Sequence, residues 1–313
     1  MARRLATVDL GTNTVRVLVV EVQGDRWSSL HEAQRVTRLG QGQAAAGKLL
    51  PEPMRRTAEA VAAFAASARA LGAKEIHVVA TSAVREAANR EEFAALVRAV
   101  AALEVEVVSG EEEARLTLLA VSAALPDLGG SFILFDIGGG STEFVAAADG
   151  RARAAVSARL GVVALAERFM DGDPAPPERL RLMRRAVESR LESELPPAIT
   201  SAGRTALVGT AGTVTTLAAL DLGLERYDGD RVHGHILTRP AVEALLERLA
   251  ALRLEERALL PCLEPGRADV VIPGTVICLC VMEMLGRESI VVSDRGLREG
   301  ILHSILEGQR RQQ

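Results

Sequence analysis

Residues 132–147 read FILFDIGGGSTEFVAA: an apolar run, an aspartate, three glycines, two hydroxyl residues, a glutamate and a second apolar run. The apolar runs predict two buried strands, and Gly138–Gly140 supply the backbone freedom that a sharp reversal between them requires. Consecutive N–H groups of small residues in a tight turn form a concave anion site, to which Ser141 and Thr142 add hydroxyl donors. The stretch therefore predicts a phosphate-binding turn, with an ordinary glycine hairpin as the alternative. Asp136 and Glu143 lie at the two ends of the turn, where their hard oxygen ligands suit Mg²⁺.

The same pattern occurs near the N-terminus, where residues 5–20 read LATVDLGTNTVRVLVV. The aligned pairs are Asp9 with Asp136, Gly11 with Gly138 and Thr14 with Ser141. An internal repeat makes a coincidence of composition the weaker explanation. Two such hairpins about a domain-length apart predict two related lobes, each with a phosphate loop facing a cleft between them, a favoured place for a ligand.

Composition and charge limit the classes of function. With 313 residues, 48% of them hydrophobic, the chain can bury the core of one large or two ordinary domains. The net charge of −4 provides no global positive field, so neither nucleic acid nor a membrane is an expected partner.

Cysteine usage and the N-terminus predict a cytoplasmic protein. Cys262, Cys278 and Cys280 are an odd number without metal-ligand spacing, as expected of buried apolar residues in a reducing compartment. The N-terminus leads directly into a strand with no signal-peptide pattern. The late apolar run at 270–285 contains Pro273 and Gly274 and is too short to cross a membrane.

Helices and strands are expected to alternate through the rest of the first lobe. Apolar periodicity, with Pro at helix starts and Gly at helix ends, sets their limits. The expected elements are strands at 27–32, 76–80 and 105–108 and helices at 53–71 and 91–103. A glycine-punctuated loop that carries Arg35 and Arg38 precedes the first of these helices.

Arg85 and the acidic residues near Glu113 can each be interpreted in more than one way. Arg85 lies in the expected loop TSAVREAANR, residues 81–90, where it can face a ligand or be a solvated charge. Ser109 and Glu112 predict a capping box, which explains the acidic residues of the next helix without any chemistry. Glu113 lies on a different face from Glu112 and is not explained in this way.

The second lobe repeats the plan. Residues 126–130, PDLGG, predict a hinge, so the expected domains are 1–125 and 126–313, with the last helix able to pack back on the first lobe. After the central hairpin, strands are expected around 152–158 and at 206–208 and a helix at 178–195; the segment 160–169 leads into the loop DGDPAPPE, and 290–293 precedes the last helix.

Two further motifs of this lobe involve glycine and histidine. GTAGT at 209–213 predicts a turn into a helix, whose N-terminus favours an anion; a plain tight turn is the alternative. The candidates for a nucleotide or substrate edge are Gly209, Thr210, Gly212 and Thr213. His233 and His235 share a face if they lie in a strand, but two histidines are an incomplete metal site, and a structural or substrate-edge role is expected.

In order and spacing, the chain resembles the exopolyphosphatase and guanosine pentaphosphate phosphohydrolase family, of the actin, sugar kinase and heat-shock ATPase superfamily. The motifs that carry the resemblance are DLGTNT, TSAVR, SGEEEARL, DIGGGSTE, GTAGT, HGH, RADVVIPG and SDRGLREGIL. The resemblance covers nearly the whole chain. It implies an α/β fold of two ribonuclease H-like (actin-like ATPase) lobes, each a mixed five-stranded sheet with flanking helices, and an active site in the interlobe cleft.

The resemblance also implies roles for single residues. Glu113 matches the family's catalytic glutamate and Arg85 its phosphate-binding arginine. Asp136 and Glu143 match positions associated with Mg²⁺; Asp9 is a further candidate ligand and Mn²⁺ an alternative metal. The residues that match the two phosphate-binding loops are Gly11, Thr12, Asn13, Thr14, Gly138, Gly139, Gly140, Ser141 and Thr142.

The reaction so implied is hydrolysis of a phosphoanhydride, in which Glu113 accepts the proton of the attacking water. Inorganic polyphosphate and guanosine pentaphosphate both fit, and the catalytic residues do not separate them. Aromatic residues are few, and besides Trp27 and Tyr227 only six phenylalanines could stack on a guanine ring, which favours polyphosphate. A non-catalytic sensor of nucleotide or polyphosphate is a third hypothesis, against which the retained Glu113 argues, and a sugar kinase is less expected still.

Longer relatives carry an additional C-terminal helical domain, which this sequence lacks. Its absence predicts a shorter binding channel and a preference for short to medium polyphosphate chains. The resemblance leaves open whether the protein forms a homodimer.

Overall fold

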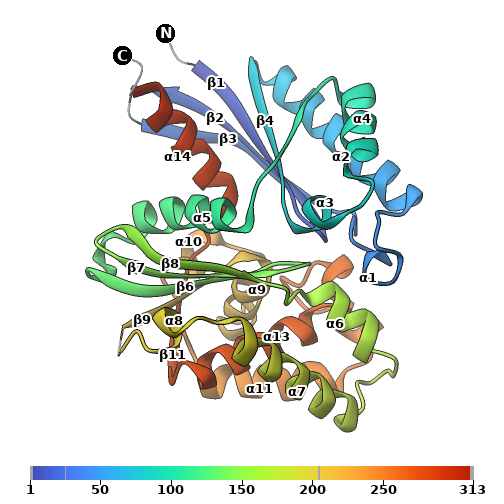
Figure 1. Ribbon diagram of the computed structural model, residues 1–313, viewed down its shortest axis with the longest axis vertical. Helices are drawn as coiled ribbons and strands as arrows, with labels where there is room; N and C mark the ends of the chain where they lie inside the picture. The colour runs from blue at the N-terminus through green and yellow to red at the C-terminus, as the bar shows by residue number, and fades with distance from the viewer. Residues whose placement is uncertain (1–2, 25, 204, 311–313) are drawn as a thin grey trace. The chain divides into compact units, whose positions relative to one another are not determined.

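The computed structural model describes residues 3–24, 26–203 and 205–310. The chain forms two compact units, one of Met1–Ala120 with Leu297–Gln313 and one of Val121–Gly296. Each unit is built on its own mixed β-sheet (Figure 1). The last residues of the chain thus belong to the same unit as the first.

The first unit contains a five-stranded sheet in the order β3-β2-β1-β4-β5. Its strands are β1 (Arg3–Leu10), β2 (Thr14–Gln23), β3 (Arg26–Val36), β4 (Glu75–Ala80) and β5 (Val105–Val107). β1, β2 and β3 are antiparallel neighbours, whereas β4 and β5 run parallel to β1. β3 is longer than the expected 27–32, because its mostly exposed side chains offer little apolar alternation from which to read its ends.

Helices cover both faces of this sheet. They are α1 (Gln43–Ala46), α2 (Pro51–Ala70), α3 (Ser82–Glu86), α4 (Arg90–Ala101), α5 (Gly110–Ala124, which continues into the second unit) and α14 (Leu297–Arg310). Successive side chains of a strand point to opposite faces. Val8 and Leu10 pack with α2 and α4, whereas Leu5 packs with Leu302 of α14 (Figure 1). Asp9 has the same parity as Leu5 and therefore lies on the α14 face.

The second unit contains a six-stranded sheet in the order β10-β11-β9-β6-β7-β8. Its strands are β6 (Ser131–Ile137), β7 (Thr142–Ala148), β8 (Arg151–Ala158), β9 (Ala206–Thr210), β10 (Ile236–Thr238) and β11 (Ser289–Val292). The hairpin β6–β7–β8 is antiparallel and β9 and β11 run parallel to β6, which repeats the plan of the first sheet. The prediction of five strands was wrong here by one: β10 has three residues, too few to show a period of two.

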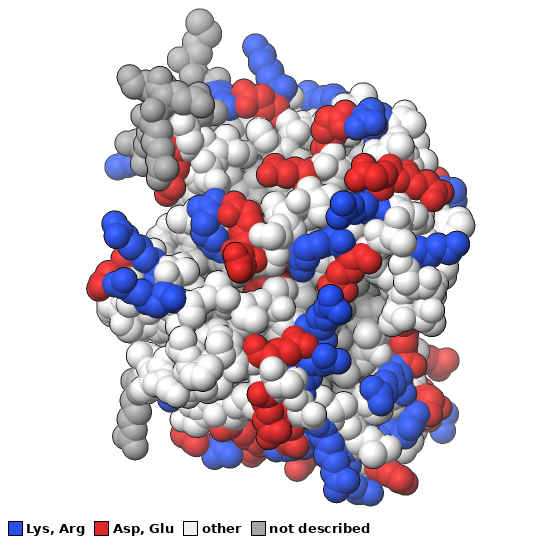
Figure 2. Space-filling model, in the orientation of Figure 1, with Lys and Arg blue, Asp and Glu red and all other residues white. Residues whose placement is uncertain are grey.

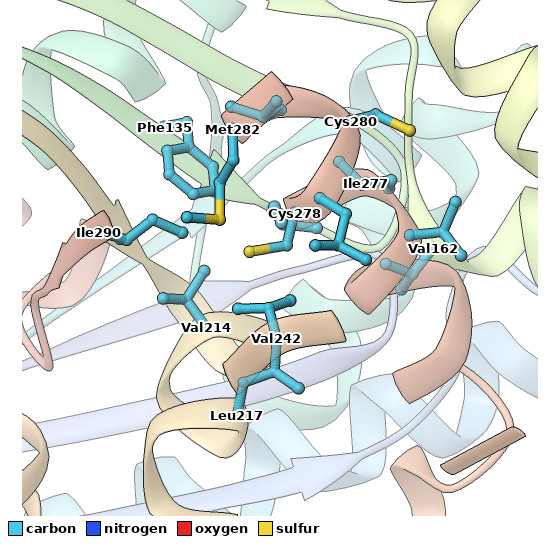
Figure 3. Packing of buried hydrophobic residues seen from close by; sticks show 14 of the residues in the cluster. Phe135, Val162, Val214, Leu217, Val242, Ile277, Cys278, Cys280, Met282 and Ile290 are labelled. Carbon is cyan, nitrogen blue, oxygen red and sulfur yellow. The ribbon is translucent and has the colours of Figure 1, made fainter. Parts of the chain in front are cut away.

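A large apolar core fills the second unit. Its helices are η1 (Pro126–Leu128), α6 (Val162–Phe169), α7 (Pro177–Glu194), α8 (Pro197–Thr200), α9 (Ala211–Asp221), α10 (Gly229–Val232), α11 (Arg239–Ala251), α12 (Leu254–Ala258), η2 (Pro265–Arg267) and α13 (Val271–Met284). Side chains of α13 pack against Phe135 and Ile290 of the sheet (Figure 3). The free thiols of Cys278 and Cys280 are buried and point in different directions, as expected of apolar packing residues.

The distribution of charge and the hydropathy of the helices, within the described residues, agree with the expectations drawn from the composition. Acidic and basic side chains are interspersed over the face seen in Figure 2. Within the described ranges, no helix combines the length and the apolar character that crossing a membrane requires.

Candidate active site

The turns of the two repeated hairpins have the same backbone geometry. The N–H of Gly11 donates to the carbonyl of Thr14 at 3.1 Å, and the N–H of Gly138 donates to the carbonyl of Ser141 at 2.9 Å. A Cβ on either glycine would lie 2.9 or 3.0 Å from that same carbonyl oxygen, so each turn requires a residue without one. The alignment of the internal repeat therefore pairs the two glycines and the two carbonyls that form this bond.

The carbonyls of the first turn are bonded to a loop that packs beside it. The carbonyl of Asn13 accepts the N–H groups of Thr37 and Arg38 at 3.0 and 2.9 Å, and that of Thr12 accepts the N–H of Gly40 at 2.9 Å. A Cβ on Gly40 would lie 2.3 Å from the Thr12 methyl carbon, so loop and turn are in close contact. The loop was expected from the sequence, but its role in holding the turn was not.

The carbonyls of the second turn are bonded to the start of α6. Those of Gly138 and Gly139 accept the N–H groups of Val162 and Val163 at 3.2 and 2.9 Å. Gly161 precedes α6, and a Cβ there would lie 2.3 Å from the Gly139 carbonyl oxygen. Glycine at both places allows helix and turn to meet backbone to backbone.

In each of the two turns, the carbonyl groups thus accept hydrogen bonds from a segment that packs beside that turn. The N–H groups of Thr12, Asn13, Gly139 and Gly140 donate to no backbone acceptor within residues 3–24, 26–203 and 205–310. Consecutive N–H groups presented in this way bind anions, as in other phosphate-binding turns. Each turn is chemically suited to the oxygens of a phosphate group.

The two hydroxyl side chains of the second turn, those of Ser141 and Thr142, are not equally available to a ligand. The hydroxyl of Thr142 is fully buried and donates to the carbonyl of Leu160 at 2.6 Å. That bond ties β7 to the end of β8 and uses the only hydroxyl proton of Thr142. Ser141, 3% exposed, lies next to it in the turn.

Arg85, which is partly exposed, and the buried Glu113 form an ion pair. Nη1 of Arg85 donates to a carboxylate oxygen of Glu113 at 3.0 Å and to the carbonyl of Val108 at 3.1 Å. The two side chains are 21% and 11% exposed. The segment that carries Arg85 was expected to be a loop, but residues 82–86 form the short helix α3, since SAVRE contains no helix-breaking residue. Two residues predicted separately are thus brought together.

The three acidic residues at the start of α5 have different environments. Ser109 Oγ accepts the N–H of Glu112 at 3.1 Å, the expected cap. The carboxylate of Glu112 does not complete a capping box, because it pairs with Arg115 at 2.7 Å. Glu111 is exposed, whereas Glu113 is buried and turned toward Arg85. Only Glu113 has the environment of a functional carboxylate.

Asp9 is a buried carboxylate. The charged residues around it were not among the predicted site residues. Burial raises its pKa, which Arg16 and Arg298 partly offset and Glu299 raises further. Nη1 of Arg16, its partner across β1 and β2, lies 3.8 Å from Oδ2. The two-residue period of side chains along a strand could have indicated that Arg16 lies on the same face as Asp9. The electrostatic effect of Arg298 and Glu299, at the start of α14, follows only from the fold.

Asp136 and Glu143 are the corresponding pair of the second hairpin. They are register partners on β6 and β7, so both carboxylates leave the same face of the sheet. Glu143 is 2% exposed and accepts a hydrogen bond from Ser157 Oγ at 2.7 Å. Where the first hairpin has an arginine opposite the aspartate, the second has a glutamate. Two carboxylates directly opposite each other repel, and this oxygen donor set suits a hard cation such as Mg²⁺.

Comparison with known proteins agrees with this geometry. Residues 18–309 match the profile of the Ppx/GppA phosphatase family. The chain belongs to this family. It is 36% identical over 318 residues to exopolyphosphatase 2 of Mycobacterium tuberculosis, covering 96% of this chain and 98% of that protein. The family and the hydrolysis of phosphoanhydrides predicted from the sequence are confirmed.

Solved structures of the Ppx/GppA family have the same fold. The family member of Aquifex aeolicus superposes with a TM-score of 0.80 at 31% identity, over 99% of each chain. An exopolyphosphatase of Cytophaga hutchinsonii superposes with a TM-score of 0.90 at 27% identity, over 98% of each chain. The predicted two-lobe actin-like fold is confirmed.

In this Ppx/GppA phosphatase the turn at 209–213 is tied into the second unit. A Cβ on Gly209 would lie 2.8 Å from the Phe135 ring, and Thr210 Oγ1 lies 3.0 and 2.9 Å from the carbonyls of Ser293 and Arg295. Thr213 packs so closely on α13 that a Cβ at Gly274 would lie 2.5 Å from its hydroxyl. Gly212 is partly exposed. Most of this turn has packing partners, and its use as a nucleotide or substrate edge stays a prediction.

The two histidines do not share a site in the second unit. His233 ends α10, with Nε2 3.2 Å from the carbonyl of Ala124, and its Nδ1 accepts the N–H of Asp294 at 3.3 Å. A neutral ring protonated on Nε2 satisfies both bonds. His235 instead lies 2.7 Å from the carboxylate of Asp221. Both rings therefore join segments of the fold.

Proposed function

We propose that the protein is an exopolyphosphatase that releases orthophosphate from the ends of inorganic polyphosphate. The observation that carries the proposal is the buried carboxylate of Glu113, held 3.0 Å from Nη1 of Arg85. A carboxylate oriented by a fixed cation is the arrangement expected of a general base that acts beside phosphate. The relatives named exopolyphosphatase support this substrate class.

In the proposed reaction, water attacks the terminal phosphorus and its proton passes to Glu113. A new bond forms between the water oxygen and phosphorus, and the bond from phosphorus to the bridging oxygen breaks. The shortened chain leaves with the negative charge on that oxygen. Proton transfer to a positioned base contributes about 10²- to 10⁴-fold to such a rate.

Arg85 and the turn N–H groups would bind the phosphate oxygens. Arg85 uses Nη1 for Glu113 and Val108, and a guanidinium has further N–H groups on Nε and Nη2 for a phosphate. Donors fixed in advance stabilise the charge that gathers on the transferred phosphoryl group without reorganising during the reaction.

Asp136 and Glu143 fit a divalent metal, because two facing carboxylates in a hard donor set favour Mg²⁺, with Mn²⁺ as an alternative. Mg²⁺ bound there would neutralise charge on the phosphate oxygens. Asp9 is a further candidate, although Nη1 of Arg16 lies 3.8 Å from its carboxylate.

Phosphate release in the presence of Mg²⁺, from polyphosphate and from guanosine pentaphosphate in parallel, tests the proposal. Glu113→Gln keeps the shape of the side chain and removes the base, so kcat should fall by about 10²- to 10⁴-fold while KM changes little. Glu111→Gln, at an exposed acid on the same turn of α5, is the matched control and should keep the wild-type rate.

The substrate that the wild type hydrolyses faster identifies the activity. Faster release from guanosine pentaphosphate would replace the proposed substrate by the nucleotide. A Glu113→Gln variant as active as Glu111→Gln would remove Glu113 from the mechanism.

A further inference from the structure

A row of polar side chains crosses the sheet of the second unit beside the second phosphate turn. It contains the proposed metal pair, Asp136 and Glu143. The strand register places on this row, from β8 to β9, Ser157, Glu143, Asp136 and Thr210. Directly opposite side chains of neighbouring strands share a face. The adjacent row on that face is entirely apolar and consists of Ala155, Val145, Leu134 and Val208. Polar character is thus concentrated in the row that holds the pair.

The hydroxyl at one end of the row is bonded to a carboxylate of the pair. Oγ of Ser157 donates to Oε1 of Glu143 at 2.7 Å. Short bonds from a hydroxyl to an ionised carboxylate are charge-assisted and about twice as strong as neutral ones. At the other end, Thr210 Oγ1 lies 3.0 and 2.9 Å from the carbonyls of Ser293 and Arg295, which use its single proton. Of the two hydroxyls, that of Ser157 serves the pair.

The surroundings of Glu143 explain why a fixed donor matters there. Glu143 is buried and lies directly opposite a second carboxylate, that of Asp136. Two such carboxylates repel, and burial withholds the water that would otherwise hydrate them. A hydroxyl bond at Oε1 restricts the orientation of the carboxylate. Both carboxylate oxygens carry lone pairs, so this bond is compatible with a bound cation.

The first unit has the same positions with a different charge. Arg16 stands where the second unit has Glu143, and its register partner on β3 is Gln34, which corresponds to Ser157. An amide has an acceptor oxygen that suits an arginine, whereas a hydroxyl donates to a carboxylate. In each row the third residue is therefore able to hydrogen-bond the charged residue beside it.

We propose that Ser157 is a positioning residue for the metal pair: its hydroxyl holds the carboxylate of Glu143 in the orientation in which Glu143 and Asp136 bind one cation. The role rests on the proposed function, and only on the part that assigns a divalent metal to this pair. All three residues belong to the second unit, on the neighbouring strands β6, β7 and β8. Hydrogen-bond partners of metal ligands orient those ligands, and their loss costs about 10- to 100-fold in metal affinity or activity.

Binding of Mn²⁺ to the full-length protein, followed by electron paramagnetic resonance without any phosphate substrate, tests this role. Ser157→Ala should raise the Kd for Mn²⁺ by about 10- to 100-fold. Ser157→Thr keeps the hydroxyl and should stay within about threefold of the wild type, whereas the isosteric Ser157→Val should weaken binding as alanine does. Ser131→Ala, at an exposed serine of β6, is the control and should match the wild type.

The Mg²⁺ dependence of phosphate release gives a second readout. In Ser157→Ala, the half-maximal Mg²⁺ concentration should rise by the same factor as the Kd, and kcat at saturating Mg²⁺ should return to within about threefold of the wild type. A general loss of structure would instead lower kcat at every Mg²⁺ concentration. The Tm without metal shows whether each variant is folded, and the comparison of threonine with valine decides if the alanine variant is not.

The outcomes separate this role from the proposed reaction. Equal Kd values in Ser157→Ala and the wild type, or in the threonine and valine variants, overturn the role of Ser157. A wild type that binds no Mn²⁺, or binds it equally well after Asp136→Asn, overturns it too, because the pair then holds no ion. If the wild type binds Mn²⁺ at the pair but releases no phosphate, the proposed reaction fails and the Kd values still decide on Ser157.

Discussion

Asp9 and Asp136 stand at the same position of two equivalent hairpins and face opposite charges. Arg16 is the register partner of Asp9, whereas Glu143 is that of Asp136. The first hairpin thus contains its own counter-charge, and the second provides a pair of carboxylates. One change of residue type at an equivalent strand position turns a shared scaffold into two chemically different sites.

The buried Asp9 predicts a stability effect that depends on pH. Burial raises its pKa in the folded chain above the ordinary value of 3.8. Between the two pKa values the folded chain binds more protons than the unfolded chain, so stability falls as pH rises and stays lower above both. Asp9→Asn should therefore raise Tm more at pH 8 than at pH 4.5.

Differential scanning calorimetry at the two pH values measures this difference. The exposed Asp127→Asn is the control and should shift Tm equally at both. A larger gain for Asp9→Asn at pH 4.5 than at pH 8 would mean that its neighbouring arginines outweigh burial.

Candidate site residues could be named where a motif marks them, and their roles stay predictions. Asp9, Asp136 and Glu113 follow from short patterns, and the repeat predicts which glycines correspond. The contacts of Arg298 were not predicted, because its partners Thr7 on β1 and Glu32 on β3 lie more than 260 residues earlier in the chain. No local pattern encodes such a contact.

Among the elements, α14 is held by backbone contact as well as by its apolar side chains. Leu302 packs with Leu5 and Leu18 of the sheet, and Gly300 allows the close approach to α5. Close packing at a glycine makes the distance between two helices sensitive to a single methyl group.

Gly300→Ala should therefore separate α14 from α5. The added Cβ would meet the carbonyl of Leu116 at 2.0 Å, and overpacking of this kind costs about 1–3 kcal/mol. Both Tm and kcat should fall, because α5 carries Glu113. Gly308→Ala is the matched control: nothing lies within 4 Å of its Cβ, and alanine favours a helix by about 0.5–1 kcal/mol. Equal Tm values for the two variants would show that α14 adjusts without strain.

Elements with strong periodicity or clear turn residues were predictable, and the two hairpins, α2 and α4 fall within a few residues of their expected limits. The short or exposed elements were not. β10 has three residues, α3 has five, and β3 is mostly solvent-exposed, so the periodic signal is too short or too weak in each. Their formation depends on strand partners and neighbouring helices more than on their own sequences.

On the scale of the whole molecule, charge constrains how a polyanion can bind. The net charge is −4, and basic and acidic side chains are interspersed over the face in Figure 2. If the proposed function holds, attraction of polyphosphate comes from a few groups such as Arg85 and the turn N–H groups. Neutral N–H groups do not neutralise phosphate charge, so binding through them releases few of the counterions condensed on the polyanion, unlike binding in a groove lined by lysine and arginine.

Salt dependence measures this difference. At a fixed excess of Mg²⁺, kcat/KM for polyphosphate should fall with KCl concentration with a log–log slope of about −1 to −2, because the proposed function has one or two arginines in contact with the substrate. Arg85→Ala should make the slope shallower by about 1, whereas the exposed Arg151→Ala should leave it unchanged. A slope of about −5 or steeper would mean that an extended set of basic residues binds the chain, which the charge pattern does not predict. An unchanged slope in Arg85→Ala would show that Arg85 serves Glu113 alone and makes no contact with phosphate.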